Sequence, residues 1–222
     1  MALLTPPQSE IDSIIALFSD NKLQEALDKV KALTKSFPKD SLLHNITGAC
    51  YAGLGQLGSA VKSYEKAIAI KPDYAKAHYN LGNALHDLAH QGLGHLDDPI
   101  KSYQRSIEID PNYAEAHSNL GSIHRDRKQL EKALLYFEKA HSLKPDMDFI
   151  LGDVLQLKMT LCKWDNLSNQ LIEVRSRIAN NERVVSPFSL LGLIDDPKLQ
   201  KKASEIYANY YYPKSDNLPN IL

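Results

Sequence analysis

Four prolines recur along the chain at nearly constant spacing, and this repetition limits the possible folds more than any other feature of the sequence. Pro38, Pro72, Pro111 and Pro145 are separated by 34, 39 and 34 residues. Proline ends a helix because it lacks a backbone N–H and clashes with the preceding turn. A period of about 20 to 50 residues predicts an array of similar units, each packed mainly against its neighbours.

Other residue types keep the same phase as the prolines. A glycine lies in the first half of three successive units, a small residue recurs in the second half, and a bulky residue follows four positions later. These positions are Gly48, Gly82 and Gly121; Ala26, Ala60, Pro99 and Ala133; and Val30, Tyr64, Tyr103 and Phe137. Small residues let the two helices of a hairpin approach closely, and bulky residues fill the space between neighbouring hairpins. The pattern therefore predicts an all-α stack of helical hairpins.

This combination of phase and residue type resembles the tetratricopeptide repeat (TPR). The resemblance implies a right-handed superhelical stack of TPR helical hairpins with a C-terminal capping helical segment. The expected units are 7–40, 41–74, 75–113 and 114–147. We expect Asp73 and Asn112 to cap the first helices of the third and fourth units, because short polar side chains can accept hydrogen bonds from free amides there.

The third unit is five residues longer than the second and the fourth. We expect Gly92 and Gly94 to end its first helix. Asp97 or Asp98 is expected to cap its second helix, with Pro99 in the first turn, where a missing N–H costs little. The insertion should therefore lengthen one loop within the hairpin and leave the stack intact.

The repeat landmarks disappear after Pro145, and we interpret residues 148–180 as a degenerate capping hairpin, followed by a linker and last helix in residues 181–222. Terminal units of repeat arrays are atypical because their outer face does not meet another repeat. The expected segments are helices at 148–161 and 165–179, an apolar connection at 181–194 that must be buried, and a last helix at 197–210.

Residues 161–212 carry a more specific resemblance. The segments LCKWDNLSNQLIEV and SPFSLLGLIDDPKLQKKASEIYANYYYP are similar to the junction between repeats and catalytic domain in bacterial proteins that resemble O-linked N-acetylglucosamine transferase. This implies that the chain, which stops at Leu222 near the expected start of that domain, is the recognition region of a larger glycosyltransferase-like protein. The alternative is a free-standing TPR adaptor in complex assembly. The sequence contains no catalytic set, so we predict that the chain itself is not an enzyme.

Charge and composition exclude several classes of partner. Lys and Arg total 26 and Asp and Glu total 27, so no basic field favours nucleic acid. No apolar stretch approaches the roughly 20 residues that span a bilayer, and the N-terminus lacks a signal-peptide pattern, so we expect a cytoplasmic protein without a membrane partner. Cys50 and Cys162 are predicted to be reduced, buried structural thiols.

The first helices of TPR hairpins line a concave groove, and a set of polar residues falls on that face here. Asn80 and Asn119 share one phase in consecutive units, Asp153 takes it in the capping hairpin, and Ile46 interrupts the row. A side-chain amide can donate to a backbone carbonyl and accept from a backbone N–H, which suits an extended peptide of variable sequence. The candidate peptide-binding residues are Lys76, Tyr79, Asn80, Asn83, His86, Asn119, Ser122, Arg125 and Asp153.

Two interpretations of this row stay open. The glycosyltransferase family named above is known for an asparagine ladder, which implies that Asn80 and Asn119 hold the main chain of an acceptor peptide. The alternative is that these polar side chains are solvated groove residues without a ligand. An adaptor that captures a C-terminal carboxylate would need several basic groove residues, and Lys76 and Arg125 alone are too few.

Other candidate chemistry is weaker. His86 and His90 are four residues apart, and with His95 they could form a zinc site, but the spacing matches no established metal motif. We therefore predict no metal and no cofactor.

The recurrent His44, His78 and His117 are interpreted as packing residues. If the chain is a piece of a larger protein, exposed Tyr210, Tyr211 and Tyr212 could produce a homodimer through the C-terminal segment.

Overall fold

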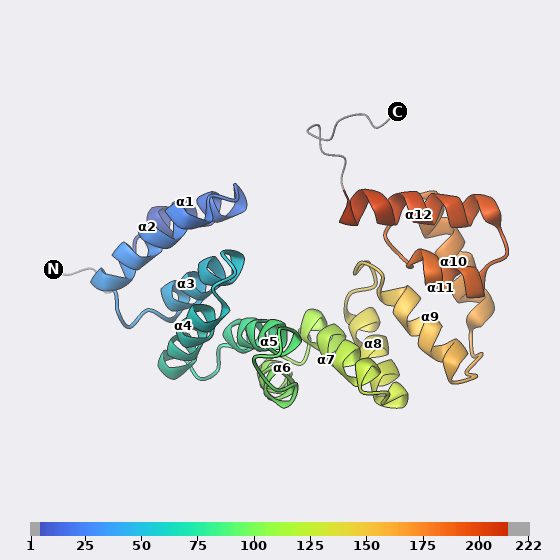
Figure 1. The fold of residues 1–222 in the computed structure, drawn as a ribbon, viewed down its shortest axis with the longest axis horizontal. Helices are drawn as coiled ribbons and strands as arrows, with labels where there is room; N and C mark the ends of the chain where they lie inside the picture. The colour runs from blue at the N-terminus through green and yellow to red at the C-terminus, as the bar shows by residue number, and fades with distance from the viewer. Residues whose placement is uncertain (1–4, 213–222) are drawn as a thin grey trace. The chain divides into compact units, whose positions relative to one another are not determined.

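The computed structural model describes residues 5–212 of the chain, and within this range every element of regular structure is a helix (Figure 1). The described helices are numbered α1 to α12 in chain order. They fall into two compact units, Met1–Ala116 and His117–Leu222, which are treated separately below. The prediction of an all-α repeat fold is confirmed. None of the described helices is long and apolar enough to cross a membrane.

Unit 1 is built from successive antiparallel helices. They are α1 (Gln8–Ser19), α2 (Leu23–Ser36), α3 (Ser41–Gly53), α4 (Leu57–Ile70), α5 (Ala75–His90) and α6 (Asp97–Ile109). Each of these helices packs against the next one along the chain, and α3 also contacts α5. The arrangement is the stack of hairpins that the proline period predicts.

The recurrent glycines and aromatic residues meet inside the hairpins. A Cβ atom placed on Gly48 would lie 2.5 Å from the Tyr64 ring, and one on Gly82 would lie 2.6 Å from the Tyr103 ring. The ring therefore lies directly on the glycine backbone of its own hairpin. Tyr64 also packs with Ala84 of the following hairpin, so the prediction that it fills the space between hairpins is confirmed as well.

A recurrent hydrogen bond joins two successive hairpins, those that begin with α3 and α5, each to the end of the preceding one. The Nε2 atom of His44 lies 2.9 Å from the carbonyl oxygen of Pro38, and the Nε2 atom of His78 lies 3.0 Å from that of Pro72. The proline thus ends one helix and leaves its carbonyl free for the next helix to bind.

The predicted N-caps were wrong at two helices. The helix α5 begins at Ala75, and no side chain caps it, so Asp73 lies one residue too early to serve. Asp97 and Asp98 belong to the first turn of α6 instead of preceding it, where their charges still favour the positive end of the helix. A cap that was not predicted occurs at α3, where Asp40 accepts from the Leu43 amide over 2.9 Å.

The inserted residues form a loop between α5 and α6, as expected. The helix α5 ends at His90, and Gly92 follows with a φ of +75°, a conformation that side chains disfavour. The Leu93 side chain in this loop is exposed.

Unit 2 contains the remaining helices. They are α7 (Ala114–Asp126), which starts at the unit boundary, and α8 (Leu130–Leu143), α9 (Ile150–Thr160), α10 (Leu167–Ala179), α11 (Pro187–Leu193) and α12 (Pro197–Tyr211). The Phe137 ring of α8 covers Gly121 of α7 in the same way as in unit 1. The short helix α11 was not predicted, although Ser186 caps it and Pro187 occupies its first turn. Its seven residues are too few to show helical periodicity in the sequence.

The connection after α10 is buried only in part, so the prediction of a buried apolar connection is confirmed for some of its residues. It crosses the start of α9, whereas Phe188 and Leu191 remain exposed. The Phe149 amide donates to the Arg183 carbonyl over 2.6 Å, and the Gly152 amide donates to the Val184 carbonyl over 3.0 Å. A Cβ atom on Gly152 would lie 2.8 Å from the Cα atom of Val185, so the crossing requires glycine at this position. The apolar side chains that this segment adds to the core of unit 2 are Val184, Val185, Leu190 and Ile194.

The two cysteines differ in their surroundings. Cys50 is fully buried in α3, as predicted, and burial raises the pKa of its thiol to about 11. The prediction that Cys162 is buried was wrong. The helix α9 ends at Thr160, and Cys162 lies in the following turn with a φ of +55°, where its side chain is exposed.

Candidate functional site

The predicted groove residues of unit 1 lie along α5, and the central one is held by a neighbour. The Nδ2 atom of Asn80 donates to the Oδ1 atom of Asn45 on α3 over 3.0 Å. Asn45 is 4% exposed, whereas Asn80 is half-buried. The sequence pattern places Asn45 on the groove face of α3, but Asn45 was not among the candidate binding residues, and Ile46 occupies the phase of the asparagine row. The structure shows that the adjacent asparagine reaches the row.

The other predicted residues of α5 divide into packed and exposed ones. Tyr79 packs against two tyrosine rings in tilted arrangements, with its ring centroid 4.8 Å from that of Tyr113 and 5.9 Å from that of Tyr103. Asn83 accepts a hydrogen bond from the Tyr103 hydroxyl over 2.7 Å. Lys76 is exposed at the start of the helix. A ligand on this face would therefore meet Lys76 and Asn80 directly, above a floor fixed by tyrosine packing.

His86 and His90 point toward each other near the end of α5. Their Nε2 atoms are 3.1 Å apart, and the rings meet edge to face. Among the described residues, no three side chains of the metal-binding types come together. The pair is explained by one imidazole donating to the other.

The predicted residues of unit 2 include a close ion pair. A guanidinium nitrogen of Arg125 on α7 lies 2.7 Å from the carboxylate of Asp153 on α9, and the guanidinium also lies over the Phe137 ring. Burial raises the pKa of Asp153 above its ordinary value, and Arg125 acts in the opposite direction. Ser122 and Asn119, about one and two turns nearer the start of α7 than Arg125, are half-buried. Because Arg125 already binds the Asp153 carboxylate, fewer of its acceptor positions are left for a ligand.

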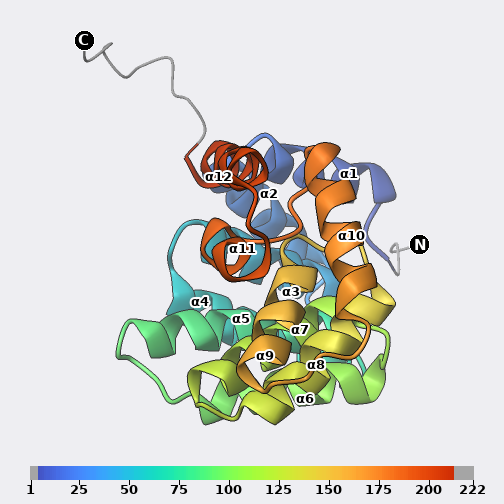
Figure 2. The same cartoon turned by 90° about the vertical axis from the view of Figure 1, so that its right-hand side faces the viewer.

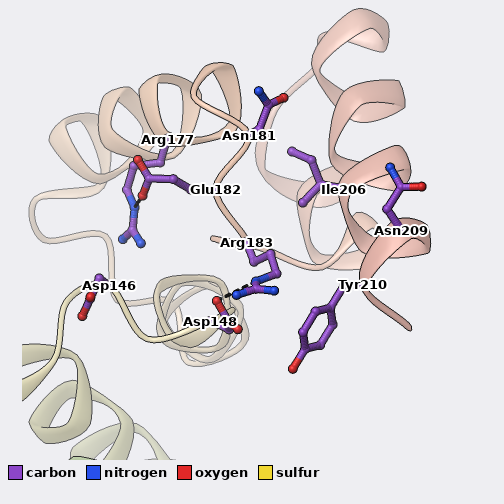
Figure 3. A pocket seen from close by; sticks show the side chains of 9 residues that line it. All are labelled: Asp146, Asp148, Arg177, Asn181, Glu182, Arg183, Ile206, Asn209 and Tyr210. Carbon is purple, nitrogen blue, oxygen red and sulfur yellow. Dashed lines mark hydrogen bonds and ion pairs between the residues drawn. The ribbon is translucent and has the colours of Figure 1, made fainter. Parts of the chain in front are cut away.

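A pocket of about 610 Å³ in unit 2 was not predicted (Figure 3). It is lined by Asp146, Asp148, Arg177, Asn181, Glu182, Arg183, Ile206, Asn209 and Tyr210. No sequence signal marks it, because its walls come from the turn before α9, from α10, from the crossing segment and from α12.

Ion pairs fix the walls of this pocket. Arg183 donates to Asp148 over 2.9 Å, and its guanidinium carbon lies 4.5 Å from the centroid of the Tyr210 ring. Figure 3 shows the Arg183 side chain between those of Asp148 and Tyr210. Arg177 donates to Glu182 over 2.7 Å and to the carbonyl of Pro145 over 2.9 Å. Because both guanidinium groups are engaged by acidic partners, the pocket has mixed charge and suits a polar ligand better than a simple anion.

An aromatic cluster adjoins the pocket. The ring of Phe149 lies within 5.5 to 6.1 Å of the rings of Tyr207, Tyr210 and Tyr211. Phe149 adopts a left-handed conformation with a φ of +61°, which is costly for a bulky residue and is maintained by this packing and by its hydrogen bond to the crossing segment. The cluster anchors α12, while Tyr210 and Tyr211 remain about half-exposed.

Family comparisons agree with the repeat pattern. The sequence model described as TPR repeat matches residues 48–88 and 93–124, and the one described as tetratricopeptide repeat matches residues 114–147. The chain therefore contains tetratricopeptide repeats.

Curated relatives match over part of the chain. The peroxisomal targeting signal receptor of Candida albicans is 31% identical over 87 residues, which are 36% of this chain and 15% of that protein. The receptor of the same name from Kluyveromyces lactis is 27% identical over 75 residues, which are 34% of this chain and 13% of that protein. The match thus spans less than a sixth of the length of each relative.

Solved structures share the fold over most of the chain. The pilF protein of Pseudomonas aeruginosa matches with a TM-score of 0.69 and 16% identity, covering 94% of this chain and 92% of that one. The thermophilic TPR protein TTC0263 of Thermus thermophilus matches with a TM-score of 0.63 and 18% identity, covering 90% and 98%. YrrB, described as a TPR protein with an unusual peptide-binding site, matches with a TM-score of 0.55 and 18% identity, covering 88% and 90%. At these identities the likeness concerns the fold.

Proposed function

We propose that the chain is a protein-binding scaffold that holds an extended peptide segment of its partner by the main chain. The observation that carries the proposal is the hydrogen bond between Asn80 and Asn45. It fixes the Asn80 amide on the first-helix face of unit 1 and uses only one of its donors. The second N–H and the Oδ1 atom are left for the carbonyl and the N–H of a peptide.

The bond to Asn45 should increase the affinity of Asn80 for a peptide, because it orients the Asn80 side chain before the peptide binds. A free asparagine loses side-chain entropy when it binds a ligand, and a side chain that is already held loses less. On α7, Asn119 is proposed to contribute in the same manner within unit 2, with Ser122 and Arg125 beside it. The remaining predicted residues, Lys76 and His86, would contact side chains of the peptide.

The comparisons support a peptide ligand. The curated relatives are named as receptors for a targeting signal, and YrrB is described as having a peptide-binding site. Both observations concern those proteins. They favour recognition of a peptide over recognition of a small molecule.

The test is a screen of an extended-peptide display library against the full chain, followed by affinity measurements on the selected peptides. We expect selected peptides to share little sequence and to lose affinity when alternate backbone amides are N-methylated, because the amides of the protein bind the peptide main chain. A set of peptides that depend on one side-chain motif and tolerate N-methylation would contradict the proposal.

We further propose that the scaffold is the recognition region of a glycosyltransferase-like protein. The support is the resemblance of residues 161–212 to the junction between repeats and catalytic domain in that family. Sequencing the coding region downstream of Leu222 tests this proposal. A glycine-containing α/β domain there would support it, and a stop codon would favour the alternative of a free-standing TPR adaptor.

A further inference from the structure

Unit 1 contains a recess of its own, separate from the pocket of unit 2, and positively charged side chains surround it. It has a volume of about 290 Å³ and lies where α2, α3 and α4 meet. Lys31 and Lys35 come from α2 and Lys66 from α4, and each of the three helices contributes one hydroxyl to the floor. The lining residues are Lys31, Thr34, Lys35, His44, Thr47, Tyr51, Ser63 and Lys66.

The charge of this recess is not balanced by the protein. Its lining contains three lysines and no carboxylate. Within the part of the chain that the structure describes, none of these three lysines forms an ion pair. Lys31 and Lys35 are four residues apart on one helix face, where like charges are destabilising. Since the whole chain has a net charge of −1, the positive charge of this recess is a local feature and does not reflect an overall basic protein.

The floor of the recess is small and polar. The hydroxyls of Thr34, Thr47 and Ser63 each donate to a carbonyl of their own helix, over 2.7 to 2.8 Å, so they close the floor without adding charge. The Tyr51 ring forms one wall, with the Nζ atom of Lys31 6.0 Å from its centroid. The donors left for a ligand are three ammonium groups and the Tyr51 hydroxyl.

The recess and the asparagine face lie on different sides of α3. Successive residues of an α-helix are rotated by about 100°, so Thr47 is about 200° from Asn45 around the helix axis. Tyr51, which follows Thr47 by one turn, stays on the side of Thr47. A ligand in the recess would therefore leave the peptide face of unit 1 uncovered, and the two sites can be tested separately.

We infer that this recess binds a phosphate monoester carried by a side chain of a partner protein. A phosphate monoester has a charge of about −1.5 to −2 near neutral pH and three strong acceptor oxygens, which match three ammonium donors. Pockets for drug-sized ligands start at about 300 Å³, so a recess of this size suits a single modified side chain. A membrane surface or a nucleic acid would need a broad basic surface, whereas this recess presents three lysines on a chain with a net charge of −1.

The test uses the full chain labelled with ¹⁵N and three probes: N-acetyl-phosphoserine amide, the same compound without phosphate, and inorganic phosphate. We expect the two phosphate probes to shift the backbone amide signals of Lys35, Thr47, Tyr51 and Lys66, and the unphosphorylated compound to shift none of them. The triple variant Lys31→Gln, Lys35→Gln and Lys66→Gln should weaken binding of the phosphoserine probe at least tenfold.

The control variant is Lys132→Gln, Lys139→Gln and Lys198→Gln, which removes the same charge from exposed positions outside the recess. Circular dichroism verifies that both variants keep their helices. If the control loses as much affinity as the recess variant, or if the phosphate probes shift signals all over the surface, binding reflects net charge alone and the inference is overturned. Absence of any shift with millimolar probe also overturns it.

Discussion

The side-chain amide of Asn80 donates to the side-chain oxygen of Asn45 over 3.0 Å, and this bond joins the first helices of two adjacent hairpins. The acceptor, Asn45, is almost fully buried, whereas the donor, Asn80, is half-buried and accessible to solvent. A buried amide therefore fixes the direction of an accessible one. This relationship is the physical basis for assigning peptide recognition to the face of α5.

The first prediction concerns the asparagines. Replacing Asn80 and Asn119 together by alanine removes amides that would bind the peptide main chain, and we expect affinity for a selected peptide to fall at least tenfold, about 1.4 kcal/mol. Replacing Asn80 also leaves the buried Oδ1 atom of Asn45 without its donor, so the melting temperature should fall as well. Isothermal titration calorimetry and thermal denaturation measure the two effects. Asn112→Ala, at an exposed turn, is the control, and an equal loss in the control would argue against the assignment.

The second prediction concerns the glycines of the repeat. Gly82→Ala places a methyl group 2.6 Å from the Tyr103 ring and should displace the tyrosine, whose hydroxyl bonds to Asn83. Overpacking of this kind costs about 1 to 3 kcal/mol in the free energy of unfolding. Gly58→Ala is the matched control, because no atom lies within 4 Å of its added methyl group and α4 should gain about 0.5 kcal/mol. Urea denaturation followed by circular dichroism compares the two, and equal stabilities would contradict the packing argument.

The third prediction concerns thiol reactivity. A thiol-specific reagent such as dithionitrobenzoate should titrate one thiol in the native protein and two in guanidinium. Cys162 is exposed, whereas Cys50 is buried with its pKa raised to about 11, so little reactive thiolate forms there. The variant Cys162→Ser should show no native reactivity. Rapid reaction of that variant would mean that Cys50 is accessible.

The fourth prediction concerns pH. Burial lowers the pKa of His141 below its ordinary value of 6.5, and the charges of Arg177 and Lys158 act in the same direction while Glu173 opposes them. The Nδ1 atom of His141 is buried without a hydrogen-bond partner. The folded state therefore resists protonation of this ring.

The sign of the pH effect follows from the lowered pKa. Above pH 6.5 the ring is neutral in both states and imposes no penalty, whereas below it the unfolded chain binds a proton first. We expect the free energy of unfolding of the wild type to decrease as the pH falls below 6.5, and we expect His141→Leu to reduce this decrease. Trp164 is the single tryptophan and lies in unit 2, so its fluorescence can follow the unfolding. Parallel pH profiles for the two proteins would refute the assignment.

The regular part of the fold could be predicted because each feature of the repeat has a local cause. Prolines end helices, and Gly48 and Gly82 accept the rings of Tyr64 and Tyr103, so their spacing indicates the hairpins directly. The exact helix starts could not be predicted in the same way. Asp73 was one residue out of place for a cap, and the exposure of Cys162 depends on where α9 ends.

The sites were harder to predict than the fold, because their residues meet only after folding. Asn45 lies one position from the phase that the row of asparagines uses, and its role becomes visible only through its bond to Asn80. Lys31, Lys35 and Lys66 each look like ordinary solvated residues in the sequence. Their convergence depends on the packing of three helices, for which no local pattern exists.

The segment that crosses the start of α9 sets a limit on how this array can grow. Repeat proteins lengthen by duplication of a hairpin, and a new hairpin needs an uncovered apolar face on which to stack. On the last hairpin that face is already taken by Val184, Val185 and Leu190, and the amides of Phe149 and Gly152 are bonded to the same segment. A hairpin inserted after α10 would have to displace this segment, so we expect duplication to be tolerated among the earlier repeats and not at this point.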